Sequence, residues 1–219
     1  MILPGTGRIA NTAPTRHIPA MNIRAPAIVC ATRAHGETAV IVRLLTESHG
    51  LIAGYVAGGR GRHLRPVLIP GNLVAAELRS RAEGQLPFAR LELSESRGPW
   101  LGEPLAAAAI GWATALTAAA LPERQPYPPL YQALVALMSA ICHAPSARGW
   151  VPGLAAYETL LLREMGYGGA PPPLAESWEA TLAALDAIGP LLERYCLADR
   201  RGDVMGARAM LRERLARIG

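Results

Sequence analysis

The chain has 219 residues and a hydrophobic fraction of 51%, which suits one or two domains with packed cores. It carries a formal net charge of +5, and all 22 basic residues are arginine, so the lysine of a P-loop is missing and nucleotide binding of that kind is excluded. No apolar run reaches the length of about 18 residues that suggests a membrane span, and the N-terminus lacks the apolar centre of a secretory signal. We therefore expect a cytoplasmic protein.

Residues 1–20 are rich in Pro, Thr and Gly and show no hydrophobic periodicity. Such a composition does not favour a packed core. We interpret this segment as a disordered leader, with Met21 as a plausible natural start, and leave it out of the predicted fold.

Between residues 26 and 95 the apolar residues alternate with a period of two, which is typical of half-buried strands. Val40, Val42 and Leu44 share one face of such a segment, while Arg43 lies on the other face. Closely spaced Gly, Pro and Asn turn signals separate five segments of this kind. The segments cover residues 25–33, 36–47, 50–58, 73–81 and 87–95. Five short strands favour a small closed barrel of the OB type, because closure leaves no exposed edge strand.

After residue 100 the period changes to that of helices. The apolar stripes include Leu105, Ala109, Trp112 and Leu116, then Leu130, Leu134, Leu137 and Ile141, then Leu154, Tyr157, Leu161 and Met165. Further helices are predicted downstream, with Pro190 expected to interrupt whichever helix contains it. We therefore predict an α+β protein, with a five-stranded OB-type barrel at residues 21–97 followed by an all-helical domain at residues 98–219.

The positive charge belongs to the first half of the chain. Residues 21–100 carry ten Arg against six Glu, a net charge of +4, whereas residues 101–219 carry ten Arg against eleven acidic residues, a net charge of −1. This asymmetry predicts that the barrel meets a polyanion and that the helices do something else.

The glycine-rich stretch GGRGRHLRP, residues 58–66, concentrates basic side chains between two predicted strands. Loops and strand faces of OB barrels hold single-stranded nucleic acid through Arg on phosphates and aromatic rings on bases. The candidate DNA-binding residues are Arg33, Arg43, Arg60, Arg62, His63, Arg65, Arg79 and Arg81. Aromatic residues are scarce here, essentially Tyr55 and Phe88, so binding should depend on phosphates, weaken with salt and tolerate different sequences. The alternative is that these arginines are ordinary solvated side chains.

The spacing of reactive residues forces no catalytic or metal-binding arrangement. The three cysteines are far apart and include no Cys-x-x-Cys pair, which argues against a disulfide framework and a zinc site. They are Cys30, Cys142 and Cys196. His35 with Glu37 and His49 suggests acid–base chemistry, and Cys30 a nucleophile, only weakly, because spacing forces no His–Asp or Cys–His geometry. We expect no catalytic residues, no metal and no cofactor.

Five short elements occur in order along the chain: HGE at 35–37, HGL at 49–51, PGN at 70–72, PER at 122–124 and GYG at 166–168. Their order and spacing resemble those of the bacterial recombination mediator family RecO, from about residue 22 to 170. The resemblance implies an N-terminal OB fold and a C-terminal helical domain. It also implies a non-enzymatic, nucleoid-associated protein of DNA repair by homologous recombination. Such a protein binds single- and double-stranded DNA, anneals complementary strands, and works with RecR and single-stranded-DNA-binding protein to load RecA at gaps.

The resemblance also implies a groove in the helical domain for the C-terminal tail of single-stranded-DNA-binding protein. This groove maps to the neighbourhood of Arg124, Tyr127 and Leu130, although proline spacing alone also explains the segment as a rigid connection. Some family members bind zinc through cysteines after the GYG element. No cysteine follows it directly here, so zinc is not expected.

Two other functions remain open from the residues. The chain can be a helical adaptor that scaffolds other proteins, and retention on single-stranded oligonucleotides at low salt separates this alternative from DNA binding. It can also be an RNA-binding OB protein, which competition between RNA and DNA identifies.

Overall fold

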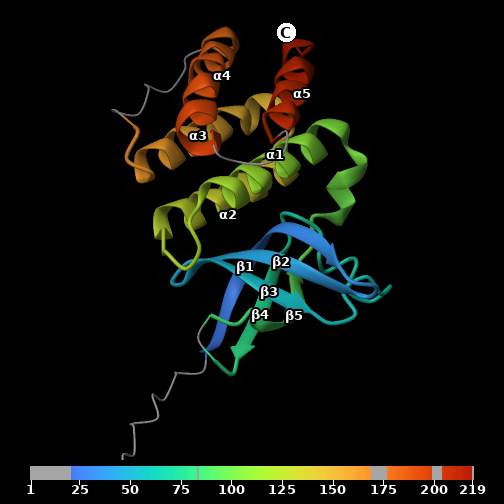
Figure 1. The fold of residues 1–219 in the computed structure, drawn as a ribbon. Helices are drawn as coiled ribbons and strands as arrows, with labels where there is room; N and C mark the ends of the chain where they lie inside the picture. Colours follow the sequence, from blue (N-terminus) through green and yellow to red (C-terminus); the bar gives the residue numbers. More distant parts are fainter. Residues whose placement is uncertain (1–20, 83, 169–176, 199–203, 219) are drawn as a thin grey trace, which may run out of the picture.

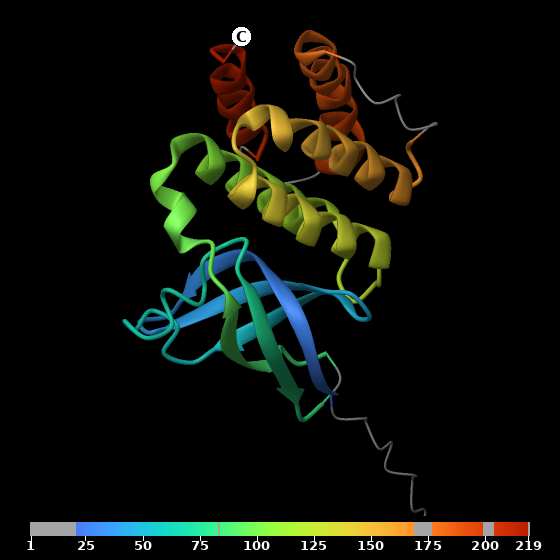
Figure 2. The same cartoon turned by 180° about the vertical axis from the view of Figure 1, so that it is seen from behind.

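The computed structural model describes residues 21–82, 84–168, 177–198 and 204–218, and places a barrel of strands against a group of helices (Figure 1). Figure 2 shows the same arrangement from behind, with the first two long helices lying between the barrel and the remaining helices. The predicted leader at residues 1–20 lies outside the described residues. None of the helices in the described ranges is both long enough and apolar enough to cross a membrane.

Five strands form the N-terminal part and close into a barrel in the order β1-β2-β3-β5-β4. The contact between β3 and β5 is parallel, and the other neighbouring pairs are antiparallel. This confirms the predicted OB-type fold. The strands are β1 (Met21–His35), β2 (Ala39–Thr46), β3 (Gly50–Val56), β4 (Leu73–Ser80) and β5 (Phe88–Glu95).

The inside of the barrel is filled by alternate residues of the strands, as the period of two predicts. Val42 and Leu44 of β2 meet Ile52 of β3 there, and all three are buried in one apolar cluster. Gly54 leaves no room for a side chain, since a Cβ there would lie 2.8 Å from that of Ala89. The barrel therefore has a packed core of its own.

Helices follow the barrel through the short 3₁₀ turn η1 (Gly98–Gly102). They are α1 (Pro104–Ala120), α2 (Pro128–His143), η2 (Ala147–Gly149), α3 (Val151–Glu164), α4 (Trp178–Leu192), the π-helical turn η3 (Glu193–Leu197) and α5 (Val204–Ala216). The expectation that Pro190 interrupts its helix is wrong, because α4 runs through it to Leu192. Pro190 lies in the last turn of α4, and the chain then continues as the wider turn η3.

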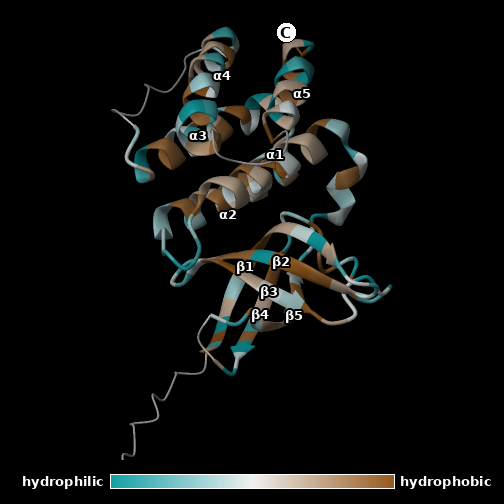
Figure 3. Ribbon diagram, in the orientation of Figure 1, coloured by the Kyte–Doolittle hydropathy of each residue, from teal (hydrophilic) through white to brown (hydrophobic). Residues whose placement is uncertain are grey.

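The barrel and the helices share one apolar core. Ile28 and Cys30 of β1, with Leu45 of β2 and Leu51 of β3, belong to the same buried cluster as the helical residues. Figure 3 shows hydrophobic residues on the stretches of β1 and β2 that lie under the helices. The two parts are therefore joined by packing as well as by the chain.

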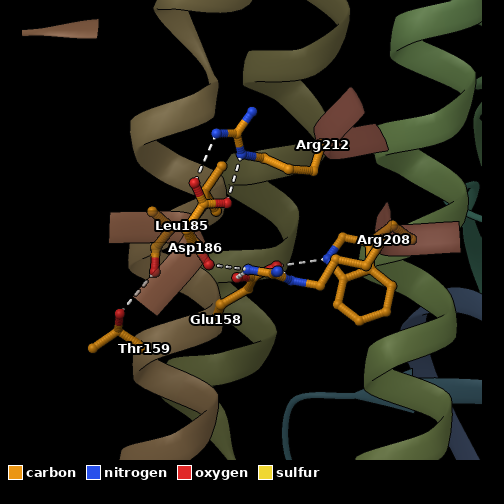
Figure 4. A network of polar contacts seen from close by, with 8 residues as sticks. Glu158, Thr159, Leu185, Asp186, Arg208 and Arg212 are labelled. Carbon is orange, nitrogen blue, oxygen red and sulfur yellow. Dashed lines mark hydrogen bonds and ion pairs between the residues drawn. The ribbon is translucent and has the colours of Figure 1, made fainter. Parts of the chain in front are cut away.

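A buried polar network holds α5 against the rest of the helical part (Figure 4). Glu158 of α3 is fully buried and accepts a 2.7 Å hydrogen bond from Trp112 Nε1. Arg208 of α5 donates to both oxygens of this carboxylate, at 3.0 and 2.7 Å, and to the carbonyl of Leu185 at 2.7 Å. Gly189 is required beside it, because a Cβ would lie 2.5 Å from the Arg208 guanidinium. Hydrophobic periodicity cannot reveal such a pair, because it involves polar residues far apart in the sequence.

Candidate nucleic-acid interface

OB barrels bind oligonucleotides on the outer face of strands 2 and 3, between the β1–β2 and β4–β5 loops. In this chain a row of side chains aligned by the strand register crosses that face and continues onto the neighbouring strands. Arg33 of β1 pairs with Ile41 of β2, Ile41 with Tyr55 of β3, Tyr55 with Phe88 of β5, and Phe88 with Arg79 of β4. At a strand spacing of about 4.8 Å the row is roughly 20 Å long. We call these five residues the outer row.

Aromatic rings contact one another along the outer row. Tyr55 meets Phe88 edge to face, with ring centroids 5.3 Å apart, and His35 meets Tyr55 in the same way at 5.9 Å. Phe88, the only phenylalanine in the chain, is 66% exposed. The sequence identified Tyr55 and Phe88 as isolated aromatics, and the structure brings them together with His35. Half-buried Tyr55 thus contacts a ring on either side, and the exposed ring of Phe88 offers an aromatic surface suited to stacking.

A β-bulge at Cys30 turns the end of β1 outward. The β1–β2 register shifts between Val29 and Ala31, so Cys30 is an extra residue in β1. Val29 points into the barrel, and strict alternation from it would point Arg33 and His35 inward as well. The bulge re-aims both side chains to the outer face. His35 was therefore missed as a member of this surface, because single-sequence alternation does not show a bulge.

The glycine-rich stretch at residues 58–66, called here the basic segment, is fixed to the β1–β2 turn by hydrogen bonds. The backbone N–H of Arg60 donates to the carbonyl of Thr38 at 3.0 Å, and its guanidinium donates to the carbonyl of Glu37 at 3.0 Å. Arg65 Nε donates to the carbonyl of Arg60 at 2.7 Å. The positive charge of this segment is thus held beside one of the two loops that border the OB binding face.

Apolar residues of the same segment close one end of the barrel. Leu68 is buried in the barrel core, and Leu64 and Val67 pack against that core. Gly59 lies so near the barrel that a Cβ would be 2.8 Å from that of Val40. The segment is therefore part of the folded barrel, with its basic side chains outward.

Four more of the predicted DNA-binding residues are exposed on the barrel. Arg62 and His63 are exposed and contact each other, with Arg62 Nε 3.2 Å from His63 Nε2. Arg81 is exposed and comes directly after β4, at the start of the β4–β5 connection. Arg33 is also exposed. The structure therefore brings most of the predicted basic residues to the outer row, to the start of the β4–β5 connection or to the basic segment beside the β1–β2 turn.

The carboxylate of Glu77 lies among these cations. Glu77 accepts hydrogen bonds from Arg24 at 2.8 and 3.0 Å and from Arg79 Nε at 2.9 Å. The hydrogen bond from Arg24, followed by that from Arg79, lowers the pKa of Glu77, so it stays ionised near neutral pH. Because two guanidinium groups share one carboxylate, this end of the outer row keeps a net positive charge.

Arg43 lies apart from the other predicted DNA-binding residues. Its guanidinium donates to the carbonyl of Ala118 at the end of α1 and lies 3.4 Å from the Glu123 carboxylate. Its side chain is only 27% exposed. Arg43 is on the outer face of β2, as the alternation predicted, but this part of the face is covered by helices. We therefore leave Arg43 out of the candidate interface.

The residues predicted to bind a partner tail do not form an open groove. Leu130 is fully buried and Tyr127 is 9% exposed, and both belong to the shared core. Arg124 is exposed and has a positive φ of 61°, and its N–H donates to the carbonyl of Leu51 at 2.9 Å. The segment thus connects α1 to α2 while contacting β3, and only Arg124 of the three offers its side chain to a partner.

Cys30 is buried in the core that the barrel shares with the helices. Burial raises the pKa of the Cys30 thiol to about 12, which keeps it protonated and unreactive near neutral pH. Across the described ranges, no group of three or more His, Cys, Asp or Glu side chains gathers as metal ligands do. That the protein needs neither a metal nor a cofactor stays a prediction.

The strand order and the exposed row define an OB-type domain followed by helices. Two models of one family match the chain, described as recombination protein O N terminal over residues 21–97 and recombination protein O C terminal over residues 101–169. The chain belongs to the recombination protein O family, RecO.

Several relatives carry the description DNA repair protein RecO. The one from Phenylobacterium zucineum (strain HLK1) is 42% identical over 149 residues, which are 68% of this chain and 60% of that protein. The one from Rhodospirillum centenum (strain ATCC 51521 / SW) is 45% identical over 143 residues, or 65% of this chain and 56% of that protein. A third, from Caulobacter vibrioides (strain NA1000 / CB15N), is 41% identical over 143 residues and is covered to 58%. The chain spans less than two thirds of the length of these relatives.

Proposed function

We propose that this chain is a DNA-binding protein of recombinational repair, which holds single-stranded DNA across the outer face of the barrel. The observation that carries the proposal is the placement of Arg33 and Arg79 at the two ends of the outer row, with further arginines on the basic segment beside the β1–β2 turn. The family and the description of its relatives as DNA repair proteins support this choice of ligand.

Binding along this face depends mainly on phosphate contacts. Arg62 is exposed on the β3–β4 segment that Arg60 fixes to the β1–β2 turn, and Arg81 is exposed at the start of the β4–β5 connection, so a backbone that crosses the face meets positive charge on either side. Such contacts release counterions and carry little sequence information. The barrel at residues 21–97 is thus the DNA-binding part, and it acts by binding and not by catalysis.

The finer functions of the family are also part of the proposal. A surface that holds one strand while screening its charge lowers the repulsion that opposes a second strand, which favours annealing of complementary strands. We propose that the helical part, residues 98–219, contacts protein partners, namely RecR and the tail of single-stranded-DNA-binding protein, in the pathway that loads RecA. Exposed Arg124 is the one of the three predicted tail-binding side chains that remains a candidate.

The salt dependence of binding tests the proposal. Affinity for a single-stranded oligonucleotide is measured at several salt concentrations for the native chain and for Arg33→Ala, Arg62→Ala and a control, Arg217→Ala, beyond α5. Loss of one phosphate contact should reduce the slope of log affinity against log salt by about 0.7 for the first two variants and leave the control unchanged. Equal slopes in all four proteins contradict binding at this face.

The same variants separate the other possible functions. Annealing of complementary oligonucleotides should slow in Arg33→Ala and Arg62→Ala and stay unchanged in Arg217→Ala. A competing RNA strand of the same sequence should displace DNA poorly if DNA is the ligand. Absence of any binding at low salt would favour a role as a protein adaptor.

A further inference from the structure

The exposed aromatic rings of the outer row have no role in phosphate binding and need an explanation of their own. Phe88 is 66% exposed, and it contacts Tyr55 on the neighbouring strand, which in turn contacts His35. Single exposed apolar residues are common on protein surfaces, but rings gathered in contact on one face offer an apolar area that a ligand can bury favourably.

Charge around the rings limits what can cover them. Arg33 and Arg79 occupy the two ends of the row, next to Ile41 and Phe88 in the register. Glu77, whose carboxylate bonds Arg79 beside Phe88, is already shared by Arg24 and Arg79. A ligand that fits must therefore combine anionic groups at the ends with flat apolar faces between them.

We propose that His35, Tyr55 and Phe88 form a base-stacking platform, so that this face selects nucleic acid with unpaired bases. The inference rests on the proposed function, since the arginines supply the phosphate contacts, and it adds the side chains that contact the bases. Bases in a duplex are stacked on their neighbours and present no free face, whereas an unpaired base can lie on an aromatic ring.

Stacking on the platform is compatible with annealing. A base whose face lies on an aromatic ring keeps its hydrogen-bonding edge free, so a complementary strand can still pair with it. The platform thus holds a single strand in a form that a second strand can recognise, while the arginines reduce the repulsion between the two backbones.

Matched oligonucleotides separate stacking from phosphate binding. The probes are a single strand of about 12 nucleotides and an abasic strand with the same number of phosphates, chosen to fit the site size of an OB fold. The native chain should bind the strand with bases about tenfold more tightly, as expected for one well-stacked base. Phe88→Leu and Tyr55→Leu should lose this preference while keeping the salt slope, because they change no charge.

Two further variants complete the experiment. Phe88→Trp should retain the preference, because it keeps a large flat ring, and Met210→Ala on α5 removes an exposed apolar side chain elsewhere as a control. Emission of a 2-aminopurine in the strand should change on binding to the native chain and to Phe88→Trp, but less with Phe88→Leu. Equal binding of both strands by the native chain overturns the platform and leaves the proposed function standing. Failure to bind either strand overturns both.

Discussion

The side-chain oxygen of Asn72 accepts a 2.7 Å hydrogen bond from the backbone N–H of Arg97. The amide nitrogen of the same fully buried side chain donates to the carbonyls of Pro66 and Val67, at 2.7 and 3.0 Å. One side chain therefore joins the basic segment to the start of the connection between barrel and helices. Asn72 of the PGN element thus fixes the basic segment in place by hydrogen bonds.

Asn72→Ala should destabilise the protein and loosen the basic segment. The change leaves two carbonyls and one N–H without their partner in the interior, which should lower the free energy of unfolding by about 1–3 kcal/mol. Urea unfolding measures the loss, and faster amide exchange at residues 60–68 than in β2 reports the loosening. Asn72→Asp keeps the acceptor and removes the donors, so a stability equal to that of the native chain in either variant would contradict this role.

Arg43→Met should affect stability and leave DNA binding unchanged. The guanidinium caps the carbonyl of Ala118 at the end of α1, where helical carbonyls lack partners within the helix. Its loss should lower the free energy of unfolding by about 1 kcal/mol, since methionine retains most of the packing of the stem. The salt slope of DNA binding should equal that of the native chain, in contrast to Arg62→Ala. A reduced salt slope in Arg43→Met would show that Arg43 does contact DNA.

Glu158→Gln should be among the most destabilising substitutions in the helical part. It leaves Arg208 as a buried cation without a carboxylate, and breaking such a pair from one side costs about 3–5 kcal/mol. Replacing both residues, as Glu158→Gln with Arg208→Met, should recover much of this loss, because no uncompensated charge remains. Thermal unfolding of the single and double variants measures the difference. A double variant no more stable than the single one would show that the pair contributes more than charge compensation.

The barrel and its five strands could be predicted because one side of every strand faces the barrel core, so alternation follows the fold directly. The surface row could be predicted only in part. Alternation placed Phe88 and Arg79 outward, but the meeting of Phe88 with Tyr55 depends on the parallel contact between β3 and β5. No local pattern encodes that contact, and the bulge at Cys30 reverses the alternation that would have located His35.

Outside the outer row too, the sequence predicted core residues better than exposed ones. The stripe that contains Leu130 marked it as a core residue, which the structure confirms, whereas the family resemblance placed it in a partner groove. Arg43 satisfied the alternation and was nevertheless covered, because alternation gives the face of a strand and says nothing about what packs on that face. Which outer residues are exposed is decided by tertiary packing between barrel and helices.

The last prediction concerns the barrel without its helices. Ile28, Leu45 and Leu51 are at most 1% exposed because helices cover them, and removal of residues 101–219 would expose all three to water. Exposing one large side chain removes about 1.5–3 kcal/mol of stabilisation. The sum for the three approaches the free energy of unfolding of a typical domain, about 5–15 kcal/mol. A chain of residues 21–100 should therefore aggregate or melt without a cooperative transition, as size-exclusion chromatography and circular dichroism would show. Leu45→Thr and Leu51→Thr in the same fragment should improve its solubility, because both side chains point away from the barrel core. If the unmodified fragment is monomeric and melts cooperatively, the shared core contributes less than its burial indicates, and the barrel is an independent folding unit.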